Sequence, residues 1–247
     1  MKINEHIIPI SKARSGRKLR KFSGVTIHET GNFSKGANAK SHDRYMHING
    51  GKNTEVSYQY VVDDVEVYHL IPDNEVAWHA GDGGSGRGNC ETIAIEICVN
   101  PDSDLAKARE NAMWLAAKIL RDHGIAKVID GTKNKANGNL FQHNTFSSYG
   151  KNCPRIIRDN ALWNGFVEGV RKYLGQSGSG SVVPNNDIAI RSIVKVTGEK
   201  YVTGQIIPAW VKNTSHIVSK IDGNKVLLGA DNGINSWVYL NDIVLAR

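Results

Sequence analysis

Two segments of the sequence each place an ionisable side chain on the strand face opposite their apolar residues. In VTIHET the two apolar residues share one face, so His28 lies on the other. In IAIEIC the three isoleucines share one face, which leaves Glu96 opposite them. An amphipathic edge strand would explain either pattern alone. The two together suggest a shared site on one sheet.

A third segment, FQHNTFSSYGKNCPR, supplies His143, Lys151 and Cys153. It is an irregular stretch rich in Asn, Ser and Gly, where functional groups commonly lie. Zinc accepts imidazole nitrogen and thiolate sulfur, and a catalytic zinc keeps three protein ligands and an open position. Together with His28, this segment would complete such a ligand set. Hydrogen-bonded histidines and a buried cysteine before a proline explain the same residues, so the pattern alone leaves both interpretations open.

The elements that position these residues follow from hydrophobic periodicity. Strands are expected at residues 24–29, 56–62, 65–71 and 93–99, and helices at 37–48, 105–123 and 159–174. The helix at 105–123 carries a single apolar stripe and is followed by a glycine. Strands interleaved with helices predict an α/β domain with a mixed β-sheet flanked by helices.

A change in composition divides the chain in two. The run QSGSGS at residues 176–181 has no apolar member and is typical of a flexible linker between residues 1–175 and 182–247. The second part contains short expected strands, separated by Gly- and Asn-containing turns, at 189–196, 211–213, 216–221, 225–228 and 236–240. This pattern predicts a small all-β barrel.

The overall composition is that of a soluble globular protein with a substantial core, with 40% hydrophobic and 22% charged residues. The net charge of +7 favours an anionic partner. Three cysteines argue against a disulfide framework. The N-terminus has no apolar segment followed by a cleavage site, and no run of 18 apolar residues occurs. We therefore expect synthesis in the cytoplasm without a signal peptide, and no insertion into a membrane.

Six motifs in residues 20–175 together resemble one enzyme family. They are VTIHET, SKGANAKSHDRYM, VSYQYVVDD, LIPDNEVAWHAGDG, IAIEICVN and QHNTFSSYGKNCP. The set resembles the type 2 N-acetylmuramoyl-L-alanine amidases, which include phage endolysins, bacterial autolysins and peptidoglycan recognition proteins. It is most similar to endolysins and prophage autolysins of Gram-positive hosts. The resemblance implies that family's fold and hydrolysis of the amide between the lactyl group of N-acetylmuramic acid and L-alanine of peptidoglycan.

The resemblance also implies a metal site. The positions that match the family's zinc ligands are His28, His143 and Cys153, which would hold one zinc per chain. Zinc would lower the pKa of its water, and Cys153 would bind as a thiolate.

Five further positions match residues that act on the substrate. Glu96 corresponds to the carboxylate that moves the proton, and Lys151 to a lysine that stabilises the reacting oxygen. Tyr58 falls where some members have a catalytic tyrosine and close relatives have tryptophan. Trp78 and His79 match the WHAG segment beside the substrate groove.

The second part resembles the bacterial Src-homology-3-like domains of cell-wall hydrolases. The resemblance rests on GEKYVTGQIIPAWVK and GINSWVYLNDIVLA. It implies a cell-wall-binding domain whose partners are peptidoglycan and anionic wall polymers. Because aromatic rings stack on sugars and peptides, the candidate contact residues are Tyr201, Trp210, Trp237 and Tyr239. The alternative is that two or three of these rings build the small core.

Two other functions compete with an amidase. A non-catalytic peptidoglycan recognition protein on the same fold usually lacks the cysteine ligand, whereas Cys153 is present here. A nucleic-acid-binding protein would need clustered basic and aromatic residues or a known motif, which the sequence lacks. We therefore expect a phage or prophage endolysin that reaches the bacterial wall after its release from the cytoplasm.

Overall fold

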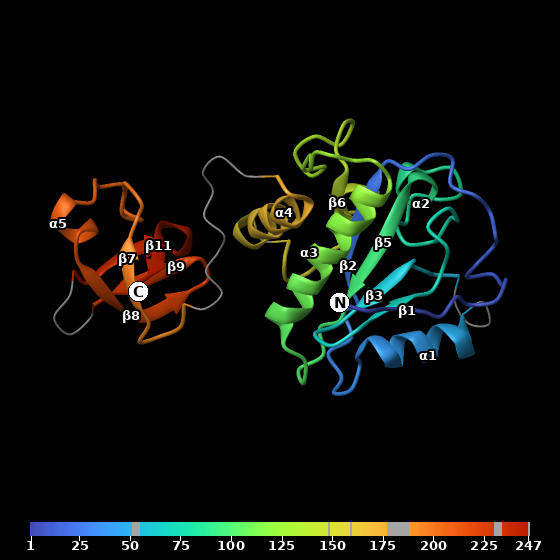
Figure 1. Cartoon of the computed structure of the whole chain (residues 1–247), viewed down its shortest axis with the longest axis horizontal. Coiled ribbons are helices and arrows are strands. Elements are labelled where there is room, and N and C mark those ends of the chain that lie inside the picture. Colours follow the sequence, from blue (N-terminus) through green and yellow to red (C-terminus); the bar gives the residue numbers. More distant parts are fainter. Residues whose placement is uncertain (51–54, 148, 159, 177–187, 230–233, 247) are drawn as a thin grey trace. The chain divides into compact units, whose positions relative to one another are not determined.

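The computed structural model describes residues 1–247 except 51–54, 148, 159, 177–187, 230–233 and 247. The chain forms two compact units, an N-terminal unit (Met1–Gly178) and a C-terminal unit (Ser179–Arg247) (Figure 1). Most of the expected linker, from residue 177 to 181, lies outside the described residues. None of the described helices combines the length and apolar character needed to span a membrane.

The N-terminal unit is built on a mixed six-stranded sheet with the strand order β1-β4-β3-β5-β2-β6. Only β3 and β4 pair antiparallel, and all other neighbours are parallel, so the predicted mixed sheet is confirmed. The three-residue strands β1 and β6 were not expected from the sequence. The strands are β1 (Ile3–Glu5), β2 (Gly24–Glu29), β3 (Tyr60–Val62), β4 (Val67–His69), β5 (Thr92–Ile97) and β6 (Leu140–Gln142).

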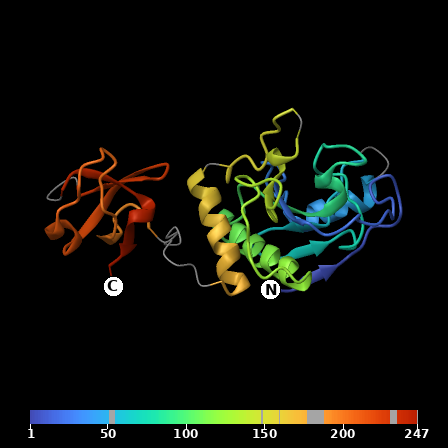
Figure 2. The same ribbon diagram turned by 90° about the horizontal axis from the view of Figure 1, so that it is seen from above.

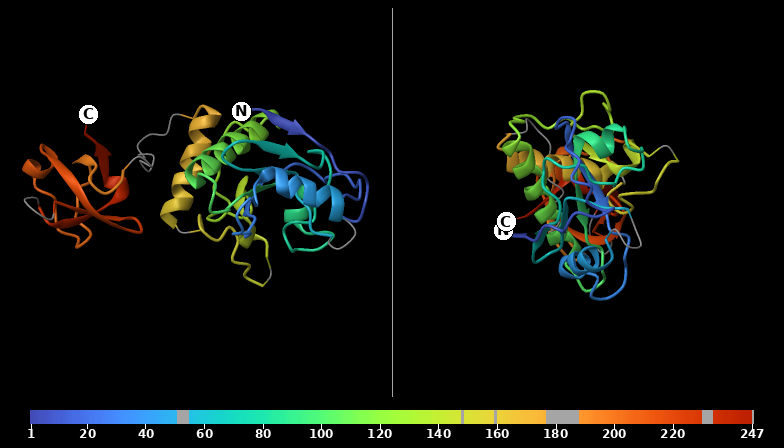
Figure 3. Two further views of the ribbon diagram at one scale, coloured as in Figure 1. Left: turned by 90° about the horizontal axis from the view of Figure 1, so that it is seen from below. Right: turned by 90° about the vertical axis from the view of Figure 1, so that its right-hand side faces the viewer.

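Helices cover both faces of this sheet, which makes two apolar layers (Figures 2 and 3). The first layer joins Ile27 and Ile95 to buried side chains of α3 and α4, and the second joins Ala94 and Cys98 to Met46 of α1. The strands β2 and β5 are therefore covered on both faces, where the alternation had suggested half-buried strands. The helices are α1 (Ala39–Asn49), the short α2 (Arg87–Glu91), α3 (Leu105–Asp122) and α4 (Asn160–Leu174).

The longest helix, α3, shows how local signals fix its ends. The side chain of Asp104 accepts hydrogen bonds from the backbone N–H groups of Ala106 and Lys107, which satisfies two donors that have no partner inside the helix. After the helix, Gly124 adopts a φ of 74°, the left-handed conformation that commonly ends helices. The helix therefore begins at the predicted residue and ends one residue before the predicted end.

At Gly24 the backbone of β2 lies very close to the backbone of Asn139, the residue directly before β6. The N–H of Val25 donates to the carbonyl oxygen of Asn139 at 2.9 Å. Gly24 has a φ of 147°, and a Cβ atom there would lie 2.2 Å from the same carbonyl oxygen. Only glycine fits this contact. The segments that carry His28 and His143 are thus brought together at the start of their strands.

The C-terminal unit is a separate antiparallel sheet with the order β10-β9-β8-β7-β11. It packs around buried aliphatic side chains that include Val194, Val218 and Val238. The predicted all-β sheet is confirmed, and its closure into a barrel stays a prediction. The strands are β7 (Ile193–Val196), β8 (Ser215–Asp222), β9 (Lys225–Leu228), β10 (Ser236–Tyr239) and β11 (Ile243–Leu245).

One predicted strand of this unit, residues 211–213, is wrong. The chain there forms a helical turn, α5 (Ala209–Lys212). Pro208 precedes the turn, and its carbonyl oxygen accepts from the N–H groups of Val211 and Lys212. Val211 is buried in the core while its neighbours are partly or fully exposed. A single apolar anchor on a turn therefore resembled a short strand in the sequence.

A short 3-10 turn, η2 (Leu240–Asp242), follows β10.

Candidate active site

The register of the two central strands brings His28 and Glu96 together. In the parallel pair β2 and β5, His28 lies directly opposite Glu96, and both side chains therefore point to the same face. The distance from His28 Nδ1 to Glu96 Oε1 is 3.8 Å. The shared site expected from the two alternating segments thus exists because the strands are adjacent and in this register.

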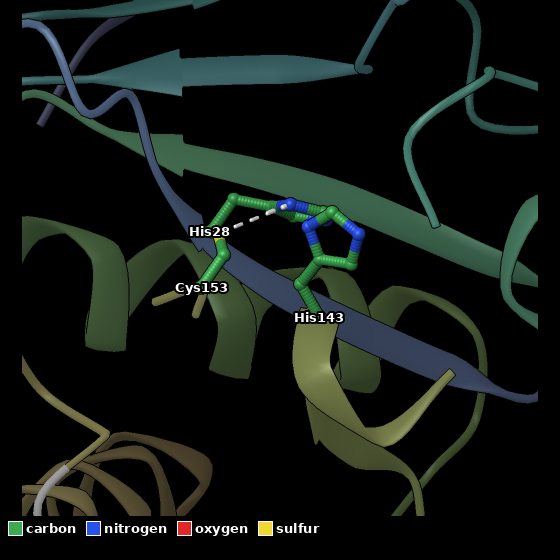
Figure 4. A group of neighbouring side chains, drawn as sticks. All are labelled: His28, His143 and Cys153. Atoms are coloured by element: carbon green, nitrogen blue, oxygen red, sulfur yellow. Dashed lines mark hydrogen bonds between the residues drawn. The ribbon is translucent and has the colours of Figure 1, made fainter. Parts of the chain in front are cut away.

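Two further groups reach His28 from the chain after β6 (Figure 4). His143 begins a 3-10 turn, η1 (His143–Thr145), immediately after the strand, and its ring centroid lies 4.5 Å from that of His28. Cys153 follows in the next loop, with its Sγ 3.8 Å from His28 Nδ1. A backbone hydrogen bond from Asn144 N–H to the Cys153 carbonyl holds that loop against the turn. One donor atom from each of the three residues lies within 4.8 Å of the others.

The protonation of this cluster suits a metal site. Burial lowers the pKa of His28 well below its ordinary value and that of His143 to about 4, so both rings are neutral at pH 7. Burial raises the pKa of the Cys153 thiol to about 12. The Nε2 atom of His143 is buried without a hydrogen-bond partner among the described residues. Two neutral imidazoles and one sulfur are a donor set that binds zinc, and an unpartnered ring nitrogen is available to bind it.

Glu96 lies between this cluster and a cavity of about 490 Å³. Its side chain is 14% exposed, and Oε2 has no hydrogen-bond partner in the described part of the chain. Burial, with a further contribution from the charge of Glu29, raises the pKa of Glu96 to about 8. The cavity is lined by Thr30, Asn32, Ala37, Ser41, His42, Tyr45, Met46, Val56, Tyr58 and Glu96.

Lys151 and Tyr58 also belong to this neighbourhood. The positive charge of the exposed Lys151 contributes to lowering the pKa values of His28, His143 and Glu96. Tyr58 lines the cavity with Glu96, and burial raises the pKa of its phenol well above the ordinary value. The phenol is therefore neutral at physiological pH and can donate a hydrogen bond.

Trp78 and His79 lie in different environments although they are neighbours in sequence. His79 is only 5% exposed, and its Nδ1 lies 3.1 Å from His28 Nε2. The Asn89 side chain fixes it by accepting from the N–H groups of His79 and Ala80. Burial lowers the pKa of His79 to about 3, so this ring is neutral as well. Trp78 is half-buried and outside the cavity lining. His79 therefore contacts the candidate metal ligand His28, and it is not among the residues that line the cavity.

A buried carboxylate that was not expected from the sequence lies beside the cluster. Glu29 is 7% exposed and accepts hydrogen bonds from the backbone N–H groups of Ile156 at 2.6 Å and Ile157 at 3.2 Å. These contacts hold the loop that carries Cys153 onto the end of β2. The one available signal was that an acidic residue directly follows His28 in a buried strand.

The four aromatic candidates of the C-terminal unit differ in exposure. Trp210 is 61% exposed and Tyr239 is 38% exposed. Tyr201 and Trp237 are half-buried, and Tyr201 packs against the core cluster. Tyr201 therefore contributes to the core, and contact of the exposed rings with a ligand stays a prediction.

Comparison with known proteins gives a family match over more than half of the chain. The family model described as N-acetylmuramoyl-L-alanine amidase matches residues 18–156, a range that ends before the C-terminal unit. The N-acetylmuramoyl-L-alanine amidase CwlH of Bacillus subtilis strain 168 is 36% identical over 168 residues, which are 68% of this chain and 60% of CwlH. The chain spans about half to three fifths of the length of such curated relatives.

Solved structures share the fold of the N-terminal unit. The catalytic domain of XlyA is 38% identical with a TM-score of 0.58, and the alignment covers 69% of this chain and 99% of that one. A mutant endolysin from Bacillus subtilis is 37% identical with the same TM-score, covering 69% of this chain and 99% of the endolysin.

The hydrogen bonds of Glu29 predict that its carboxylate keeps the Cys153 loop closed. In Glu29→Gln one acceptor oxygen becomes an N–H₂ group, which cannot accept from the backbone. Because a hydrogen bond to a charged group stabilises by about 1.5–3 kcal/mol, the loop should open about tenfold more often or more. Alkylation of Cys153 in metal-free protein, followed by mass spectrometry, measures this opening.

The matched control is Glu91→Gln. Glu91 is equally buried and accepts from Arg20 and Ser23, away from the Cys153 loop. Its substitution should leave the labelling rate of Cys153 unchanged. Equal Cys153 labelling in wild type and Glu29→Gln would show that Glu29 does not hold the loop.

Proposed function

The chain belongs to the N-acetylmuramoyl-L-alanine amidase family, and we propose that it hydrolyses the amide between the N-acetylmuramic acid lactyl group and L-alanine in peptidoglycan. The observation that carries the proposal is the buried convergence of His28, His143 and Cys153 beside Glu96 at the edge of a cavity. The names of the similar proteins support the same reaction.

The proposal includes one zinc ion at the candidate active site, held by His28, His143 and Cys153. The donor set, the neutral imidazoles and the unpartnered Nε2 of His143 all support this ion. When bound, zinc supplies Lewis acidity that lowers the pKa of water toward neutrality. The cysteine also favours a catalyst over a recognition protein on the same fold, because Cys153 completes the set of three ligands.

Glu96 is the group that we assign to proton transfer. Its carboxylate faces both the ligand cluster and the cavity, so it reaches a water molecule and the scissile amide. It would accept a proton from the attacking water and return it to the amine of L-alanine as the amide bond breaks. A pKa of about 8 in the metal-free protein means that a nearby cation is needed to favour the ionised base at neutral pH.

Lys151 and Tyr58 are assigned to the substrate carbonyl. Attack by water leaves negative charge on the carbonyl oxygen, and we assign its stabilisation to the Lys151 ammonium, whose charge also lowers the pKa of Glu96. The neutral phenol of Tyr58 lies in the same cavity and can donate a hydrogen bond to the substrate or to the departing group.

His79 is assigned a positioning role, with Trp78 kept as the candidate substrate contact. The Nε2 atom of His28 lies 3.1 Å from Nδ1 of His79, and with its proton on Nε2 His28 would donate to His79 and keep Nδ1, the atom nearer Cys153, free to bind a metal. This contact fixes both the tautomer and the orientation of His28. The burial of the His79 ring supports this role, and the substrate contact expected for His79 stays a prediction.

The C-terminal unit is proposed to bind the cell wall as a Src-homology-3-like domain. Its compact antiparallel sheet and its exposed Trp210 and Tyr239 support a surface that stacks on sugars or peptides. Tyr201 and Trp237 would support that surface from partly buried positions. Similarity to an endolysin supports a phage or prophage endolysin that acts on the wall of a Gram-positive host. The boundaries 1–175, 176–181 and 182–247 belong to the same proposal.

The reaction is tested by the products of digestion. Purified peptidoglycan treated with the protein should gain free amino groups of L-alanine and no new reducing sugar ends. Glu96→Gln should slow this release about 100- to 10,000-fold, because glutamine keeps the shape but cannot accept the proton. Its zinc content should equal that of wild type, since the three ligands are unchanged.

The control for this variant is Glu110→Gln, an exposed side chain on α3 that should retain full activity. New reducing ends would show a glycosidase and refute the proposed reaction. Near-wild-type activity in zinc-loaded Glu96→Gln would move the proton transfer to another group, with Tyr58 first.

The number of protons released when zinc binds should follow from the pKa values of the groups at the site. At pH 7 both imidazoles are already neutral and need not release a proton to bind a metal. The Cys153 thiol is protonated, and Glu96 is mostly protonated. Zinc binding to metal-free wild type should therefore release between about one and two protons, and Glu96→Gln should release about one. Calorimetry in buffers of different ionisation enthalpy measures the number.

The pH dependence of the number of released protons provides a control within the same experiment. Above pH 8 Glu96 is already ionised in the metal-free protein, so the wild-type number should fall toward that of Glu96→Gln. The number for Glu96→Gln should stay constant over the same pH range, because burial, the main cause of the raised pKa of the Cys153 thiol, is unchanged in this variant. Zinc binding without proton release at pH 7 would exclude Cys153 as a thiolate ligand.

Wall binding by the C-terminal unit is tested at its most exposed aromatic ring. Trp210→Ala should weaken co-sedimentation of the full chain with purified walls about fivefold or more, as loss of a tryptophan at a binding hot spot does. Ile206→Ala is the matched control, since Ile206 is 74% exposed in the same unit but has no ring to stack. Equal wall binding by wild type and Trp210→Ala would remove Trp210 from the contact surface.

A further inference from the structure

A second group of metal-binding side chains lies outside the proposed active site. His6 directly follows β1, and Asp43 and His47 are one helical turn apart on α1. Asp43 Oδ1 lies 2.8 Å from His6 Nδ1 and 3.3 Å from His47 Nδ1. The two imidazole rings are stacked, with centroids 3.7 Å apart. One donor atom from each of the three residues lies within 4.8 Å of the others, and the exposed His6 ring would turn out of the stack to direct its nitrogen at a shared ion.

Among the described residues, no lysine or arginine forms an ion pair with the carboxylate at the centre of this cluster. The side chain of Asp43 is 4% exposed, and its ion-pair partners among the described residues are the two histidines. A buried carboxylate is costly unless a positive charge offsets the loss of water. Neutral imidazoles donate hydrogen bonds but bring no charge, and two stacked imidazolium rings would repel each other. One divalent cation would satisfy the carboxylate without either problem.

The chemistry of the donors selects the kind of cation. Two imidazoles and one carboxylate suit zinc and its first-row neighbours, whereas calcium and magnesium prefer oxygen ligands throughout. Ligands about 2.0–2.2 Å from one zinc ion lie at most about 4.4 Å apart, and the two measured donor separations fall below this limit. His6 is 55% exposed, so its ring is free to adjust while Asp43 stays fixed in the protein.

We propose that His6, Asp43 and His47 form a second zinc site, which fastens α1 to the segment after β1. Four other residues of α1 line the cavity beside Tyr58 and Glu96, and they are Ser41, His42, Tyr45 and Met46. The second ion therefore holds the helix that forms one wall of the cavity. It does not share a ligand with the His28, His143 and Cys153 cluster, so the two sites can be emptied separately.

Metal stoichiometry of the full chain tests the second site directly. Metal-free protein is dialysed against Zn²⁺, and zinc per chain is measured by elemental analysis. Wild type should hold about two zinc ions, and His28→Ala and His6→Ala about one each. The double variant His6→Ala/His28→Ala should hold none. His6 is exposed, so its replacement leaves the core unchanged.

Two further variants separate a built site from chance binding by surface histidines. Asp43→Asn keeps the volume and both histidines but removes the charge, and in the His28→Ala background it should weaken zinc binding about 10- to 100-fold or more. His123→Gln is the matched control, because His123 stacks on Phe22 and bonds to the carbonyl of Ile119 away from the cluster. This control should retain both zinc ions.

Thermal unfolding gives a readout that does not depend on activity. Zinc should raise the melting temperature of His28→Ala, because an ion that binds only the folded state stabilises it. It should not raise the melting temperature of the double variant. The proposal is overturned if wild type binds a single zinc that His28→Ala abolishes, or if His6→Ala still binds two. Retention of both ions by His28→Ala alone would instead refute the ligand set of the proposed active site.

Discussion

The parallel pairing of β2 with β5 on one side and β6 on the other is the constraint on which the rest of the site depends. One pairing sets His28 opposite Glu96, and the other delivers His143 at the first residue after β6. A slip of one residue in either register would turn these side chains to the opposite, apolar face. Gly24 protects the register, since its missing Cβ permits the backbone contact with Asn139.

Burial on both faces of the sheet shifts the pKa values of the groups that this strand pairing brings together. The layer under α3 and α4 anchors the isoleucines of β2 and β5, and the other layer encloses the ionisable groups. Loss of water keeps the imidazoles neutral and the thiol and Glu96 protonated. The same burial that packs the strands therefore leaves a cluster of uncharged donor atoms, from which a metal ion would displace the proton of the Cys153 thiol.

The groups around the cluster keep its members in place. His79 contacts His28 from behind, and Asn89 fixes the backbone of His79. Glu29 ties the Cys153 loop to the end of β2, although the two are more than 120 residues apart in sequence. A site of this kind needs such support, because ligands carried by a loop are otherwise poorly oriented.

The sequence by itself determined the features that depend on local periodicity and on motif order. Alternation placed His28 and Glu96 on the face opposite the isoleucines, and an apolar stripe with a following glycine defined α3 to within one residue. The ordered motifs identified the family, and they nominated His143, Lys151 and Cys153 for roles that stay predictions. None of this required knowledge of which strands are neighbours.

Only the tertiary structure decided the contacts between distant segments. The strands β1 and β6 are too short for periodicity to show, and one buried valine on a turn was mistaken for a strand. The burial of His79 behind His28, the hold of Glu29 on the Cys153 loop and the meeting of His6 with α1 depend on strand order and helix docking. Residues far apart in a chain carry no local signal of their contact, because the apolar cores that bring them together are formed by the whole unit.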